Sequence, residues 1–267
     1  MIEKYENQSL DEIASLLVND KLTFSVLVSI LSYPCQKIIT DKKHFIICYS
    51  CSPFPVWVWT LDNTPNEVYK QVCDIIKLEF YKKDNFFFNV KHEFFQYLKN
   101  HDKMNDWYVS TNMLTYDCPC PIPPKKQIEG SLTVATMEDF EITRILIRGV
   151  FDATSEKRIT EKECDDITKS HIASGNLYLW KSNTGNAVAM SYVDYGFEFG
   201  KVTLVYTNPS ERCKGYASRI VFEVSCLIAD KGLMPILYTD GDYDASNECY
   251  KGIGYIERGC LYSISRN

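Results

Sequence analysis

A proline-rich segment near the middle of the sequence sets the strongest limit on the fold. Residues 117–130 read DCPCPIPPKKQIEG and contain four prolines. Proline has no backbone N–H and favours extended backbone, so this segment can form neither a helix interior nor a central strand. We therefore expect two domains, at 1–120 and 131–267, joined by a proline-rich linker at 121–130.

The composition favours folded domains over a disordered chain. Of the 267 residues, 45% are hydrophobic and 13% are aromatic, which is enough to form apolar cores. The net charge of −6 argues against a general binder of nucleic acids or anionic membranes. It favours a cationic small substrate over an anionic one, and we expect no nucleic-acid partner.

The apolar runs are too short for a membrane span. The longest, at 22–31 and 217–229, fall below the roughly 20 residues that a spanning helix needs. The opening residues MIEKYEN are polar and acidic, unlike a signal peptide. The eleven cysteines are scattered and odd in number, which favours reduced thiols. These features predict a cytoplasmic protein without a membrane partner, and they leave the oligomeric state open.

Two close cysteine pairs make a zinc site the main alternative for the cysteines. The pairs are Cys48 with Cys51 and Cys118 with Cys120. A structural zinc ion takes four ligands, and only His44 lies near the first pair in sequence. We therefore expect no metal.

Hydrophobic periodicity and turn residues predict an α+β fold in both halves. In the first half the predicted helices are 9–18, 22–32, 66–81 and 93–100, and the predicted strands are 44–51, 56–61, 86–90 and 107–116. In the second half the predicted strands are 131–135, 177–180, 187–192, 202–207, 235–239 and 255–264, with helices at 136–150, 161–174, 217–230 and 245–251. The halves repeat one element order, which indicates a duplication, and each should form a mixed sheet flanked by helices.

The stretch 202–218 carries the clearest chemical signal. A buried strand runs into the loop NPSERCKG, and the loop runs into an amphipathic helix. Unpaired backbone amides at a helix N-terminus bind anions, and the helix dipole favours negative charge there. Gly215 allows the backbone to approach a phosphate closely, while Arg212 and Lys214 supply positive charge. This pattern predicts a pyrophosphate site.

Two motifs in the second half resemble those of the GNAT superfamily of acetyl-coenzyme A-dependent N-acetyltransferases. Arg212-x-x-Gly215-x-Ala217 is similar to its [Gln/Arg]-x-x-Gly-x-[Gly/Ala] loop. Asn247-x-x-Tyr250, followed by Ile-Gly-Tyr, is similar to its Asn-x-x-Tyr helix. The segment VYTNPSE at 205–211 resembles the sequence before the same loop in a two-domain subgroup of this superfamily. In that subgroup the N-terminal half has the same fold and a degenerate loop. The resemblance implies tandem GNAT-like domains, with a degenerate domain at 1–120 and an acetyl-CoA-binding catalytic domain at 131–267.

The resemblance also implies a role for each matching position. Main-chain groups of Val205 and Thr207 would bind the pantetheine amides, and Asn247 would contact the pantetheine arm. The Tyr250 hydroxyl would lie near the thioester sulfur and protonate the departing thiolate. The pyrophosphate would be held by Arg212, Cys213, Lys214, Gly215, Tyr216, Ala217 and Ser218.

Some positions depart from the family pattern or allow a structural role. Cys213 stands where many relatives carry a second glycine, and no Asp or Glu lies on 202–207, where relatives often place the general base. Glu198 and Asp194 lie upstream as alternatives. Tyr250 can also be read as a packing residue and Asn247 as a helix cap, although the shared motif favours roles at the cofactor.

We therefore expect an N-acetyltransferase that moves an acetyl group from acetyl-CoA, its co-substrate, to a small primary amine. Transfer should be direct, in a ternary complex, because the motifs place no cysteine or serine to receive the acyl group. One alternative is an N-acyltransferase of the glycine-conjugating type that uses another acyl-CoA. The other is a non-catalytic acyl-CoA-binding module, for which the missing strand carboxylate is the main support.

Overall fold

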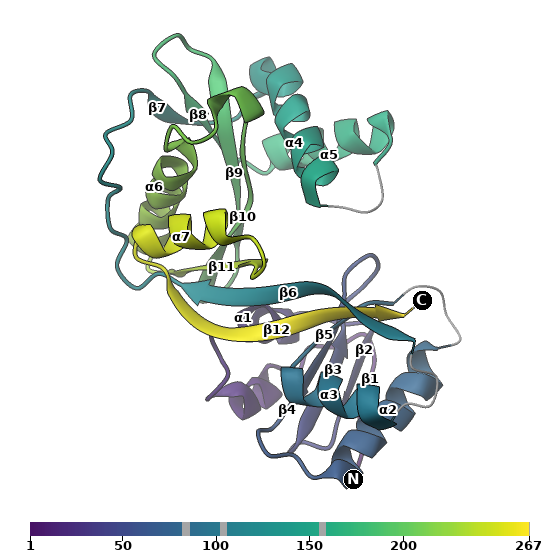
Figure 1. The fold of residues 1–267 in the computed structure, drawn as a ribbon. Coiled ribbons are helices and arrows are strands. Elements are labelled where there is room, and N and C mark those ends of the chain that lie inside the picture. The colour runs from purple at the N-terminus through teal and green to yellow at the C-terminus, as the bar shows by residue number, and fades with distance from the viewer. Residues whose placement is uncertain (82–85, 102–105, 155–158, 267) are drawn as a thin grey trace. The chain divides into compact units, whose positions relative to one another are not determined.

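The computed structural model describes residues 1–81, 86–101, 106–154 and 159–266 (Figure 1). In the first half the elements are β1 (Glu3–Tyr5), the 3-10 helix η1 (Asp11–Leu17), α1 (Ser25–Leu31), β2 (Lys37–Thr40), β3 (Phe45–Tyr49), β4 (Val56–Thr60), α2 (Asn66–Phe80), β5 (Phe88–Val90), α3 (His92–His101) and β6 (Trp107–Asp117). In the second half they are β7 (Ser131–Val134), η2 (Met137–Asp139), α4 (Phe140–Thr154), α5 (Glu161–Ala173), β8 (Leu177–Lys181), β9 (Ala187–Tyr195), β10 (Phe199–Thr207), η3 (Pro209–Glu211), α6 (Tyr216–Asp230), β11 (Met234–Asp240), α7 (Asp244–Gly252) and β12 (Ile256–Arg266).

One order of elements occurs twice along the chain. The first copy is β3, β4, α2, β5, α3 and β6, and the second is β9, β10, α6, β11, α7 and β12. In each copy the first two strands are antiparallel, and the helix that follows returns the chain to a parallel strand. The predicted repeat of element order is confirmed.

The chain forms two compact units whose boundaries are not continuous in sequence. Unit 1 comprises Met1–Tyr116, Tyr238–Tyr243 and Glu257–Asn267, and unit 2 comprises Asp117–Leu237 and Asp244–Ile256. The proline-rich segment thus lies within unit 2. The C-terminal strand lies within unit 1, because β12 pairs with β5, with Tyr262 opposite Val90. The proline content instead predicts a linker at 121–130 and places everything from 131 onward in the second domain.

Unit 1 has a sheet whose strand order is β1-β2-β3-β4-β5-β12-β6. Its strand β4 is buried on both faces because the side chains alternate between two cores. Val56 and Val58 pack with α2 and α3 on one face. On the other face the Trp57 ring lies 6.1 Å from the Phe24 ring, and the Trp59 indole donates to Asp20 Oδ2 at 2.7 Å.

Unit 2 has a sheet with the strand order β7-β8-β9-β10-β11. The strands are antiparallel except for the parallel pair β10–β11. The helices α4 and α5 cover one face, and α6 covers the other (Figure 1). The prediction of an α+β fold, with mixed and mostly antiparallel sheets flanked by helices, is confirmed in both units.

The local predictions differ from the structure mainly in the first half. Residues 11–17 form a 3-10 helix rather than part of an α-helix, and the helix predicted at 22–32 spans only Ser25–Leu31. The short strands β1 and β2 were not predicted, because three or four residues are too few for a periodic signal. In the second half, Thr136 and Asp139 form a capping box that precedes η2 and then α4.

None of the helices within the described residues combines the length and the hydropathy of a membrane span.

The placement of β12 predicts that unit 1 loses stability when its last core residue is truncated. Ile264 is fully buried in the unit 1 core, whereas Ile256 on the same strand is 47% exposed. Ile264→Ala should cost about 3 kcal/mol through lost burial and a residual cavity. Urea unfolding should show the lower midpoint for Ile264→Ala, with Ile256→Ala close to the parent chain. Equal midpoints for the two variants would contradict the assignment of β12 to this core.

Candidate functional site

The strand β10 leaves regular pairing near its carboxyl end. Thr203 pairs with Tyr192 on β9 and Tyr206 pairs with Met190, so β10 has one extra residue in this interval. Leu204 has a positive φ of 49°. Such a β-bulge takes main-chain groups out of the regular ladder. The bulge therefore places the backbone of Val205, a predicted cofactor contact, at an irregular point of the sheet.

The loop between β10 and α6 reverses the chain through two left-handed residues. It begins with Asn208, whose Oδ1 accepts from the Ser210 backbone N at 3.2 Å. Cys213 has a φ of 61° and Gly215 a φ of 97°. Glycine adopts this conformation without strain, whereas cysteine does so at a cost. Glycine would therefore suit this position better than the exposed Cys213 that this chain has there.

Gly215 is required by its surroundings as well as by its φ. A Cβ atom there would lie 3.0 Å from Ile128 Cδ1 and 3.6 Å from Lys126 Cδ. Both neighbours belong to the proline-rich segment, so this segment packs on the loop. Sequence reasoning missed these contacts, although the basic pair Lys125–Lys126 in an acidic chain was a visible signal.

The helix α6 begins directly after Gly215 without a side-chain cap. The Arg219 backbone N donates to the Gly215 carbonyl at 3.1 Å, which forms the first helical hydrogen bond. The amides of Tyr216, Ala217 and Ser218 therefore precede the first intrahelical donor. Uncapped amides at the positive end of a helix form an anion site.

The two cations of the loop differ in their pairing. Lys214 Nζ lies 2.9 Å from Glu211 Oε2, and this hydrogen bond raises the pKa of the lysine. The exposed Arg212 donates through Nε to the Thr207 carbonyl at 3.4 Å, and its guanidinium lies 5.4 Å from the centroid of the Tyr206 ring. Within the described residues, Thr207 Oγ1 is a buried atom without a hydrogen-bond partner.

The helix α7 presents Asn247 and Tyr250 on its buried face, with exposures of 4% and 9%. It contacts α6 through the Cys249 thiol, whose Sγ lies 3.1 Å from Ser218 Oγ. Burial raises the pKa of Tyr250 well above its ordinary value of 10.0, so its hydroxyl stays protonated to higher pH than that of an exposed tyrosine. Ser218 in the first turn of α6 thus connects the helix that follows the loop to α7.

Tyr255, just after α7, fixes this helix end to α6. Its hydroxyl lies 2.7 Å from Ser225 Oγ, and its ring lies 6.0 Å from the ring of Tyr250. Ser225 donates to the Val221 carbonyl at 2.7 Å, so the Tyr255 hydroxyl is the donor in the contact with Ser225.

The upstream carboxylates considered as general bases lie far along the strand. Glu198 precedes β10, and Asp194 is paired with Lys201, whose Nζ lies 3.5 Å from Asp194 Oδ2. At a rise of about 3.3 Å per residue, Val205 lies about 23 Å beyond Glu198 and about 13 Å beyond Lys201. Neither carboxylate is within direct hydrogen-bond reach of the bulge.

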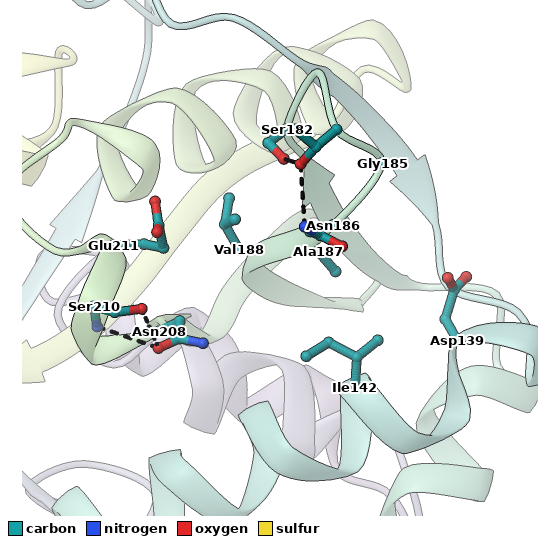
Figure 2. Close-up of a pocket in the computed structure, with 11 residues that line it drawn as sticks. Asp139, Ile142, Ser182, Gly185, Asn186, Ala187, Val188, Asn208, Ser210 and Glu211 are labelled. Atoms are coloured by element: carbon teal, nitrogen blue, oxygen red, sulfur yellow. Dashed lines mark hydrogen bonds between the residues drawn. The ribbon is translucent and has the colours of Figure 1, made fainter.

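A pocket of about 550 Å³ borders the same loop (Figure 2). Three apolar side chains line it, those of Ile142, Ala187 and Val188. Asn208, after β10, and Glu211, in η3, line it as well. The remaining lining residues are Asp139, Ser182, Thr184, Gly185, Asn186 and Ser210. The pocket is thus mostly polar, and its carboxylates are ion-paired: Asp139 Oδ1 lies 2.6 Å from Lys181 Nζ.

The described residues contain no group of three or more His, Cys, Asp or Glu side chains arranged to hold a metal ion. In unit 1 the thiol neighbour of Cys48 is Cys35, with a distance of 3.6 Å between the two Sγ atoms.

Comparisons with known proteins identify the fold. The family model for FR47-like protein matches residues 177–263, from the start of β8 into β12. No curated protein sequence matches the chain. Three solved structures match over nearly the whole chain at low sequence identity. They are an acetyltransferase from the GNAT family of Colwellia psychrerythraea (12% identity, 100% of this chain and 100% of that chain, TM-score 0.57), a Drosophila protein (12%, 100% and 98%, 0.68) and a GCN5-related N-acetyltransferase from Sphaerobacter thermophilus (11%, 100% and 95%, 0.62).

The likeness to these structures covers both units, and the family-model match contains the bulged strand, the left-handed loop and α7. The chain therefore has the GNAT acetyltransferase fold over its full length, with an FR47-like domain at residues 177–263.

Proposed function

We propose that the protein is an N-acetyltransferase that transfers an acetyl group from acetyl-CoA to a small primary amine. The observation that carries this proposal is the uncapped start of α6 behind the left-handed Gly215, next to an exposed arginine. A diphosphate is the ligand whose charge and size suit adjacent main-chain amides at a helix N-terminus.

In this proposal, coenzyme A binds to unit 2 from the start of α6, along β10, to α7. The diphosphate would be held by the amides of residues 213–218 and by Arg212. The pantetheine arm would run along the bulged end of β10, where the main chain of Val205 and Thr207 can bind its amides. The buried Thr207 Oγ1, unpartnered within the described residues, offers a further polar contact there. Asn247 on α7 would contact the same arm.

The chain's own groups suit direct transfer to an amine. Bound acetyl-CoA supplies a thioester carbonyl, and the amine nitrogen attacks the carbonyl carbon as the carbon–sulfur bond breaks. A backbone amide at the Val205 bulge can donate to the carbonyl oxygen as negative charge develops there. The reaction needs no acyl-enzyme, because the protein's contribution is to align the amine and the thioester.

Tyr250 is the proposed acid for the departing sulfur. A tyrosine hydroxyl is protonated at neutral pH, and the raised pKa of the buried Tyr250 keeps it a donor to higher pH. The amine must lose a proton in the same reaction. The distances along β10 disfavour Glu198 and Asp194 as direct acceptors, and we assign that role to no residue of the chain.

One cofactor per chain is part of the proposal. In unit 1 the turn after β4, residues 61–65, reads LDNTP and has no glycine. Lys91, directly after β5, forms two ion pairs. Its Nζ lies 2.6 Å from Oδ1 of Asp62, which is in this turn, and 2.6 Å from Oδ2 of Asp20. These contacts support a degenerate first domain that binds no second coenzyme.

We also retain the predicted cytoplasmic location as part of the proposal. It is supported by the eleven cysteines, all of which are free thiols. Free thiols are typical of reducing compartments.

Gly215→Ala should weaken CoA binding at least about tenfold, because the new Cβ meets Ile128 and the left-handed turn is strained. Isothermal titration calorimetry with CoA measures this effect. Gly175→Ala is the matched control, since Gly175 also has a positive φ but has open space around it. Equal dissociation constants for the two variants would contradict the proposed diphosphate site.

Tyr250→Phe should lower turnover about 100-fold or more while the KM for acetyl-CoA stays nearly unchanged, because the lost hydroxyl acts only on the departing thiolate. The measurement is thiol release with an amine panel. Tyr255→Phe is the control: it loses the hydrogen bond to Ser225, at about 1 kcal/mol of stability, but should keep its turnover.

The same assay separates the alternative functions. Thiol release from benzoyl-CoA but not from acetyl-CoA indicates the glycine-conjugating type of N-acyltransferase. CoA binding without thiol release from any donor indicates a binding module. Parent-like turnover of Tyr250→Phe would remove the proposed role of the tyrosine and leave the cofactor site in place.

The raised pKa of Tyr250 also predicts the pH dependence of turnover. The hydroxyl must keep its proton to act as an acid, and a pKa raised above the ordinary value of 10.0 keeps it protonated to higher pH. Turnover at saturating substrates should therefore not decline between about pH 8 and about pH 10. A fall in the parent chain over this range, absent from Tyr250→Phe, would contradict the assignment.

A further inference from the structure

The helix α4 carries a glycine in its interior, at residue 149. Glycine lowers helix stability relative to alanine, so an interior glycine calls for a packing reason. Here a Cβ atom would lie 2.4 Å from both Cζ and Oη of Tyr206 and 2.6 Å from Cε1. These distances are about 1 Å shorter than ordinary van der Waals contact, so the Tyr206 ring occupies the space that a side chain at 149 would need.

The Tyr206 ring in turn supports Arg212 in the loop. The guanidinium carbon lies 5.4 Å from the ring centroid, within the range of a cation–π contact. The Arg212 Nε donates to the Thr207 carbonyl at 3.4 Å, which gives the same side chain a second restraint. Two contacts therefore orient a side chain that is otherwise exposed.

Arg212 remains able to bind an anion in this arrangement. Its Nη atoms make no hydrogen bond or ion pair within the described residues, since the hydrogen bond to Thr207 uses Nε and the other restraint is the contact with the Tyr206 ring. Lys214 differs, since its ammonium is paired with Glu211. An oriented guanidinium with free donors is suited to bind two oxygens of a phosphate group.

We propose that Gly149 is a positioning residue for the diphosphate of coenzyme A, acting through the Tyr206 ring on Arg212. The absence of a side chain at 149 lets the ring lie against α4, and the ring holds the guanidinium toward the loop. This inference rests on the proposed function, because it needs the diphosphate at the start of α6. It gives α4, on the opposite face of the sheet from α6, a part in the affinity for the coenzyme.

A double-mutant cycle tests the proposal with CoA as the probe. Gly149→Ala should raise the dissociation constant about threefold, because the displaced ring no longer supports Arg212. Arg212→Gln, which alters an exposed side chain and leaves the core intact, should raise it at least as much. The double variant should match Arg212→Gln alone, because the glycine acts only through the arginine. An equal additional loss from Gly149→Ala in both backgrounds would overturn the proposal.

Salt dependence distinguishes the loss of a charge contact from a general structural effect. The difference between the parent and Gly149→Ala should shrink in about 1 M NaCl, where the Debye length is about 3 Å. A difference that does not depend on salt would also overturn the proposal. Gly252→Ala is the matched control and should bind as the parent does, since this helical glycine has open space where a Cβ would be added.

The outcomes separate this inference from the function on which it rests. If the parent chain fails to bind CoA, the proposed function falls and the positioning role falls with it. If the parent binds CoA and Gly215→Ala weakens binding but Gly149→Ala does not, the coenzyme site stands and the role of Gly149 is wrong. Thermal unfolding of each variant shows that the chains compared are folded.

Discussion

The left-handed backbone at Gly215 is the constraint on which the arrangement of unit 2 around the site depends. The chain must leave β10, reverse and begin α6 within a few residues, and it does so through positive φ values at Cys213 and Gly215. The proline-rich segment closes over this turn, since a Cβ atom at residue 215 would lie only 3.0 Å from Ile128 Cδ1. The turn thus leaves the first amides of α6 uncapped. The proline-rich segment packs against the turn at Gly215.

The contacts between α6 and α7 explain how the second motif reaches the same place. Ser218 in the first turn of α6 contacts Cys249, and Ser225 two turns later accepts from Tyr255. These contacts hold α7 with its buried face inward. Tyr250 is therefore desolvated and neutral, which a solvent-exposed tyrosine on the same helix would not be at high pH. The chemistry proposed for Tyr250 thus depends on packing between two helices.

Prediction from the sequence was most reliable where a pattern is local. The strand, the loop and the helix around Gly215 were predicted correctly. Elements of three or four residues, such as β1 and β2, have no periodic signal of their own and form because neighbouring strands pair with them. The proline-rich segment reads as a linker, but the Ile122 backbone N donates to the Ile253 carbonyl at 2.9 Å, so it packs on unit 2.

The sequence by itself determined the fold class, the repeated element order and the loop between β10 and α6, because these follow from hydrophobic periodicity, glycine and proline chemistry, and short motifs. Only the tertiary structure decided that β12 joins the core of unit 1 and that Tyr206 lies between Gly149 and Arg212. The physical reason is that each of these depends on strand register or on side-chain contact between residues distant in sequence, and local patterns do not encode such contacts.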